Sequence, residues 1–162
     1  GLPKWMSEGH PVTDDQTPSR ERHFTSRLNN ALVRSVDDVL GLIESKREQI
    51  VDARAAARFR GEAPEPRAGL RGGHMPGAFN LPYNELLDPA TGTMLPADKL
   101  AARIAASGID PSKKVTASCG SGVTACVIAL ALYLTGSPEA AVYDGSWTEW
   151  GGRADTPIVT GP

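Results

Sequence analysis

Hydrophobic positions follow two different periods in turn along most of the chain. In residues 35–45, Val36, Val39 and Ile43 recur at helical spacing behind Ser35, whose side chain can cap the first turn. Residues 49–54, which read "QIVDAR", follow and are predicted to form a short buried strand. The first unit is therefore predicted to be a helix followed by a strand.

The alternation of strand and helix continues to residue 151. Gly108 and Gly136 close two of the later helices, as glycines commonly do. Because alternating strands and helices build a parallel sheet with helices on both faces, we expect an α/β three-layer sandwich of about five mostly parallel strands. The pattern predicts strands at 78–82, 113–118 and 140–146, helices at 95–108 and 123–136, and a short turn at 147–151.

Two segments follow neither period. Residues 59–77 are rich in proline, glycine and arginine, which predicts a long loop, and long loops in compact domains are commonly functional. Residues 1–24 are polar and hold three prolines, although residues 2–9 are typical of a helix end closed by a glycine. We interpret 1–24 as the remnant of an earlier domain plus a linker, and 25–162 as the main domain.

Length and charge narrow the class of protein. A chain of 162 residues can bury the core of one domain without disulfides. Its net charge of −2 shows no excess of either sign, so neither nucleic acid nor a membrane surface is an expected partner. The apolar run 123–135 is shorter than the roughly 20 residues that span a bilayer, which indicates a buried helix.

The two cysteines are expected to be free thiols. Cys119 and Cys126 are seven residues apart, which on a helix is about 10 Å, beyond the usual Cα separation of about 4 to 7 Å in a disulfide. The first residues also lack a secretory pattern. We therefore expect a cytoplasmic, reducing location.

Cys119 lies where chemistry is expected in an open parallel sheet. It follows the strand at 113–118 and precedes the helix at 123–136, at the sheet edge where ligands bind. Gly120 and Gly122 let backbone N–H groups turn inward, and the helix N-terminus adds partial positive charge. This cradle favours a thiolate, with Cys119 exposed at its mouth as the nucleophile. Cys126, among apolar residues of the helix, is expected to be a packing residue.

Several cysteine chemistries fit the sequence poorly. A cysteine phosphatase loop needs an arginine six positions after the cysteine, and Ala125 stands there. Position 122, three residues on, is a glycine, so the spacing of a thioredoxin-like cysteine pair is absent, and His74 is the one weak candidate for a base. A persulfide carrier needs only the thiolate and the N–H groups that the loop supplies. The sequence therefore favours sulfur transfer.

Five motifs resemble those of a known family and occur in the same order along the chain as in that family. They are "DAR" at 52–54, "RFRGEAPEPR" at 58–67, "GHMPGAFNLP" at 73–82, "CGSGVTA" at 119–125 and "YDGSWTEWG" at 143–151. Together they resemble the catalytic C-terminal rhodanese domain of the 3-mercaptopyruvate sulfurtransferases. The opening residues resemble the closing helix of the N-terminal rhodanese domain in these two-domain enzymes, which the resemblance makes a partner of this domain.

The resemblance implies a reaction and its residues. Cys119 would take sulfur from 3-mercaptopyruvate, release pyruvate and pass the sulfur to a thiol, thioredoxin or cyanide, with no cofactor or metal. Ser121 would hydrogen-bond near the thiol and help to move a proton. Arg58 and Arg67 would bind the carboxylate and ketone oxygen of the donor, as paired guanidinium groups can. The cradle is expected to use the backbone of Gly120, Ser121, Gly122, Val123 and Thr124.

Other interpretations of the same residues remain open. Arg58 and Arg67 could instead pin the loop through ion pairs with Glu62 or Glu65, and the domain could be a non-catalytic binding module. A thiosulfate:cyanide sulfurtransferase is a further alternative, although the neutral residues at 120–122 favour an organic donor.

The remaining polar and aromatic residues of the motifs are given structural roles. His74 and Asp52 are expected to hold loops, Trp147 and Trp150 to pack at the rim of the site, and Arg60 and Arg71 to face solvent.

Overall fold

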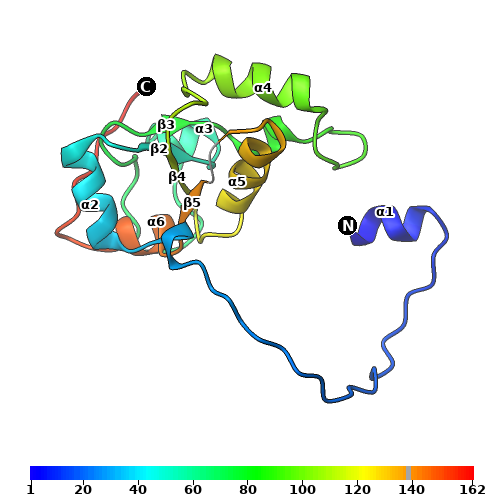
Figure 1. Cartoon of the computed structure of the whole chain (residues 1–162). Helices are drawn as coiled ribbons and strands as arrows, with labels where there is room; N and C mark the ends of the chain where they lie inside the picture. Colours follow the sequence, from blue (N-terminus) through cyan, green and yellow to red (C-terminus); the bar gives the residue numbers. More distant parts are fainter. Residues whose placement is uncertain (138–139) are drawn as a thin grey trace.

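A five-stranded parallel sheet forms the centre of the computed structural model, which describes residues 1–137 and 140–162 (Figure 1). The strand order is β1-β5-β4-β2-β3, and each pairing between these strands is parallel. The strands are β1 (Val33–Arg34), β2 (Gln49–Asp52), β3 (Phe79–Asn80), β4 (Val115–Ser118) and β5 (Ala141–Tyr143). The predicted parallel sheet is confirmed.

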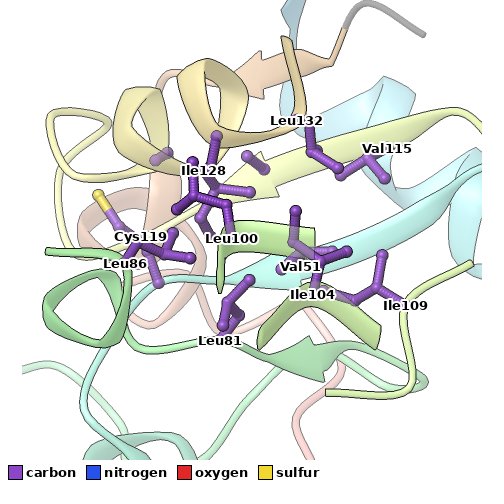
Figure 2. Close-up of a cluster of buried hydrophobic side chains, with 14 residues drawn as sticks. Val51, Leu81, Leu86, Leu100, Ile104, Ile109, Val115, Cys119, Ile128 and Leu132 are labelled. Atoms are coloured by element: carbon purple, nitrogen blue, oxygen red, sulfur yellow. The ribbon is translucent and has the colours of Figure 1, made fainter. Parts of the chain in front are cut away.

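Helices cover both faces of this sheet. One face packs against α4 (Ala97–Ala106) and α5 (Ala125–Leu134) through the cluster drawn in Figure 2, and the other against α2 (Val36–Ser45) and α6 (Ser146–Trp150). Successive residues of a strand point to opposite faces, so Val51 belongs to the first cluster and Ile50 to the second. The predicted three layers are confirmed.

Local signals placed the helix ends correctly. Ser35 caps α2 in a reciprocal capping box with Asp38, which satisfies backbone N–H groups that a free helix start would leave unpaired. Gly108 and Gly136 adopt left-handed φ angles of 76° and 77° just beyond α4 and α5.

The structure also corrects parts of the sequence interpretation. The short elements β1 and α3 (Ala56–Phe59) were not predicted, and residues predicted as a turn at 147–151 lie largely in α6. Trp147 and Trp150 pack as expected, but both are fully buried in the core rather than at a rim. Arg71 does not face solvent, because its guanidinium donates to the carbonyls of residues 150, 151 and 156.

The N-terminal segment lies apart from the sheet. Helix α1 (Leu2–Ser7) forms as expected, and residues 8–29 contain no helix or strand. Figure 1 shows α1 joined to the rest by an extended segment, and residues 1–30 are all exposed. Whether this helix comes from an earlier domain stays a prediction.

Helix α5 is only half-buried, although its apolar sequence predicted a buried helix. Ala125, Ile128, Ala131 and Leu132 pack into the core, whereas Leu130 is 46% exposed. Among the described residues, no helix combines the length and the apolar character needed to cross a membrane.

The two faces of α5 should respond very differently to the same substitution. Leu132→Ala should lower the free energy of unfolding by about 2 to 5 kcal/mol, because it leaves a cavity in the packed core. Leu130→Ala, in the same helix, should change it by no more than about 0.5 kcal/mol. Urea denaturation measures both, and equal losses would contradict the placement of α5.

Candidate active site

Cys119 lines a cavity at the carboxyl end of β4. The cavity has a volume of about 400 Å³ and is also lined by Arg54, Arg58, Glu65 and Arg67. The side chain of Cys119 is part of the hydrophobic core cluster, and the residue is 1% exposed (Figure 2). The expectation of an exposed thiol is therefore wrong, because the sheet and α5 enclose the loop from behind.

The second cysteine has the opposite surroundings from those expected. Cys126 is free, as predicted, but exposed, and its thiol donates to the carbonyl of Gly122 at 3.6 Å. It is the second residue of α5, one position beyond Ala125, which occupies the core side. The helix phase therefore turns Cys126 outward, which a run of apolar letters does not reveal.

The loop after β4 stabilises the thiolate of Cys119. Burial raises the pKa of this thiol, but hydrogen bonds outweigh that effect and leave the pKa below its ordinary value. They come from the Thr124 hydroxyl and from the backbone N–H groups of Ser121, Ala125 and Thr124. The ten-residue helix α5 begins here and adds its positive end. The site therefore favours a nucleophilic sulfur.

The hydroxyl beside the sulfur belongs to Thr124, which was expected to contribute only backbone. Ser121 contributes its backbone N–H, and its residue is exposed. The proton-transfer role of the Ser121 hydroxyl stays a prediction.

Ser146 fixes the shape of this loop. The backbone N–H groups of Cys119 and Gly122 donate to the Ser146 hydroxyl at 3.1 and 3.0 Å, and that hydroxyl donates to the carbonyl of Tyr143 at 2.8 Å. Gly122 has a φ of 83°, and a Cβ there would lie 3.0 Å from the carbonyl oxygen of Asp144. Glycine is therefore required at this close approach. Sequence reasoning missed Ser146 because its partners are 24 and 27 residues away.

Arg58 both lines the cavity and forms an ion pair. Its guanidinium donates to Glu65 at 2.6 Å, so the alternative of a loop-pinning ion pair is confirmed for this residue. The same group lies over Gly120, where a Cβ would approach Nη2 to 3.3 Å. Arg58 is thus held beside the cysteine loop with part of its side chain, 25%, still exposed.

Arg67 lines the same cavity but has a neutral hydrogen-bond partner. Its Nη1 donates to the Thr148 hydroxyl, and within residues 1–137 and 140–162 no carboxylate lies at ion-pair distance from it. The structure therefore brings Arg58, Arg67 and Cys119 together. Of the two arginines, Arg58 is paired with a carboxylate, whereas Arg67 has no carboxylate partner among the described residues.

Arg54 was not singled out as a site residue, although it ends the quoted motif "DAR". It is 2% exposed, pairs with Asp52 and Glu65 at 2.7 and 2.8 Å, and lies over the Trp147 ring. The expected anchoring role of Asp52 is confirmed through this pair. The sequence signal that could have identified Arg54 is the acidic and basic pair, Asp52 and Arg54, at the end of a predicted buried strand.

His74 holds the loop as expected. Its Nδ1 lies 2.8 Å from the carbonyl of Phe59, and its ring stacks on the Phe59 ring. Over the described part of the chain, no cluster of His, Cys, Asp and Glu could hold a metal ion.

Comparisons with known proteins agree with this geometry. A family model described as "Rhodanese-like domain" matches residues 35–153. The chain is 40% identical over 154 residues to 3-mercaptopyruvate sulfurtransferase from Rattus norvegicus and 44% identical over 155 residues to thiosulfate sulfurtransferase from Bos taurus. Each alignment covers 95% of this chain and 52% of the relative, so the chain spans about half the length of these curated relatives.

A solved structure leads to the same assignment. The crystal structure of SseA from Escherichia coli, described with the rhodanese fold of 3-mercaptopyruvate sulfotransferases, matches with a TM-score of 0.76 and 38% identity. The match covers 91% of this chain and 54% of that one. Because the family model spans α2 to α6 and four of the five strands, β2 to β5, the chain belongs to the rhodanese-like domain family.

Proposed function

We propose that this chain is the catalytic domain of a sulfurtransferase that accepts sulfur from 3-mercaptopyruvate on Cys119. One observation carries the proposal: the buried thiol of Cys119, whose pKa the loop lowers, shares a cavity with two guanidinium groups, those of Arg58 and Arg67. The thiolate supplies the nucleophile, and the guanidinium groups match a 2-keto acid. No cofactor or metal is needed for this chemistry.

In the proposed first step, the Cys119 thiolate attacks the sulfur of the donor. The new S–S bond forms as the C–S bond of 3-mercaptopyruvate breaks, and the electron pair of that bond leaves as the enolate of pyruvate. Arg58 and Arg67 hold the carboxylate and the enolate oxygen, where negative charge develops. Protonation of the enolate, in which Ser121 takes part, releases pyruvate and leaves Cys119 as a persulfide.

In the second step an acceptor thiol, thioredoxin or cyanide attacks the outer sulfur of the persulfide. The inner sulfur leaves as the Cys119 thiolate, and the N–H groups of residues 121, 124 and 125 stabilise it again. One cradle therefore serves both half-reactions.

The donor follows from the residues of the loop, since relatives of both names are about equally similar to this chain. Gly120, Ser121 and Gly122 are neutral, so they offer no charge-assisted bonds, each worth about 1.5 to 3 kcal/mol, to a doubly charged inorganic donor. A Cβ at position 120 would also lie 3.3 Å from Arg58 Nη2, which is a tight contact. We therefore favour the organic donor over thiosulfate.

The partner and the location are also proposals. We propose that a second, N-terminal rhodanese domain is the partner of this domain, because the curated relatives are about twice as long. Both cysteines are free, which suits a reducing, cytoplasmic setting. A non-catalytic binding module is the alternative, and it requires no sulfur on Cys119.

Loss of the Cys119 thiol should abolish sulfur transfer. Cys119→Ser should form no persulfide and release no pyruvate from 3-mercaptopyruvate, whereas Cys126→Ser should retain both. The measurements are intact mass after donor treatment, for one added sulfur atom, and pyruvate release. Normal pyruvate release by Cys119→Ser would refute the mechanism, and an unmodified wild-type chain would favour the binding module.

The thiolate should persist below the ordinary thiol pKa of about 8.5. In the Cys126→Ser background, ultraviolet absorbance of the Cys119 thiolate should titrate with a midpoint below that value. Thr124→Val removes a hydrogen bond to the charged form, so the midpoint should rise by roughly one unit. An unchanged midpoint in Thr124→Val would contradict the cradle.

Arg67 should act mainly through the donor carboxylate. Arg67→Met should raise KM for 3-mercaptopyruvate roughly tenfold or more, because it removes a charge-assisted bond. The rise should be much smaller for thiosulfate. Arg60→Met, in the same loop but paired with Glu62 outside the cavity, should leave KM unchanged. Steady-state kinetics with both donors measures this, and equal losses for the two donors would argue against a carboxylate clamp.

A further inference from the structure

Thr148 connects the exposed cation of the site to the cysteine loop. Its hydroxyl accepts a hydrogen bond from Arg67 Nη1 and donates one to the carbonyl of Gly120 at 2.6 Å. Arg67 and Thr148 are 81 residues apart in sequence, and Thr148 and Gly120 are 28 apart. One side chain of α6 therefore joins the long loop to the residue that follows Cys119.

Both hydrogen-bonding functions of this hydroxyl are in use. A threonine hydroxyl has one hydrogen to donate, and here Gly120 receives it, so the Arg67 guanidinium is the donor in the other bond. Arg67 lies on an exposed loop, where a long arginine side chain has many rotamers. The Thr148 hydroxyl restricts that freedom at the edge of the cavity.

Thr148 itself does not line the cavity that Cys119 and Arg67 share. Any effect of its hydroxyl on a donor in that cavity must therefore pass through Arg67 or through the loop. The backbone N–H of Thr148 also donates to the Gly120 carbonyl, at 2.9 Å, so the loop keeps one bond to α6 when the hydroxyl is removed. The two routes can thus be separated by experiment.

We propose that Thr148 is a positioning residue that sets donor specificity by holding Arg67 at a fixed place relative to Cys119. This inference rests on the proposed function. Thr148 links Arg67 to the carbonyl of Gly120, the residue that follows Cys119, so a carboxylate bound by Arg67 places the donor sulfur at the thiolate. A donor without a carboxylate gains nothing from this arrangement.

The test compares Thr148→Val, which keeps the shape and loses the hydroxyl, with Thr148→Ser, which keeps the hydroxyl. In the 162-residue chain, Thr148→Val should raise KM for 3-mercaptopyruvate about three- to tenfold, the effect of one hydrogen bond. It should leave kcat and the pH midpoint of the Cys119 thiolate unchanged, and Thr148→Ser should behave like the wild type. In an Arg67→Met background, Thr148→Val should have no further effect.

A loop-supporting role would give a different pattern. It would lower kcat, move the thiolate midpoint and persist in the Arg67→Met background, and that result would overturn the proposal, as would a wild-type KM in Thr148→Val.

Titration with pyruvate, the 2-keto acid product, gives a readout that does not need turnover. Weaker pyruvate binding by Thr148→Val than by the wild type supports the positioning role even if the wild type forms no persulfide, a result that would reject only the proposed function. A wild-type chain that neither binds pyruvate nor takes up sulfur overturns both.

Discussion

The rest of the site depends on the ion pairs that the buried guanidinium of Arg54 forms. This guanidinium is paired with Asp52 at the end of β2 and with Glu65 in the long loop, and it donates to the carbonyl of Gly73. It also lies 3.9 Å from the centre of the Trp147 ring. Removing one member would leave a buried charge unpaired, which commonly costs about 3 to 5 kcal/mol. A loop without regular structure is thereby fixed to the sheet and to α6.

The positions of the candidate catalytic groups follow from this arrangement. Glu65 is shared between Arg54 and Arg58, so the carboxylate that completes the buried network also places Arg58 beside Gly120. Trp147 packs under Arg54 and donates its backbone N–H to the carbonyl of Cys119 at 2.9 Å. Arg58 and Cys119 are therefore joined by one connected set of contacts, which runs through Glu65, Arg54 and Trp147.

Burial of Cys119 reconciles reactivity with protection. An exposed low-pKa thiolate would react with any oxidant or electrophile in solution. Here the sulfur is reached through a cavity whose polar walls carry guanidinium groups, so small anions have preferred access. The desolvation that raises the thiol pKa is offset by donors already in place, and such a preorganised environment would need no rearrangement during the proposed sulfur transfer.

Local patterns along the chain were enough to predict the α/β class, the capping of α2 by Ser35, and the place of Cys119 between a strand and a helix. These features depend on residues that are close together in sequence, so the hydrophobic period and the capping residues are enough to predict them. The same patterns could not show that Cys119 is buried and Cys126 exposed, or which arginines form ion pairs, because these properties depend on packing between distant segments. Contacts such as Arg67 with Thr148 join residues 81 positions apart, so they exist only once the strand order brings the ends of β2, β4 and β5 to one edge.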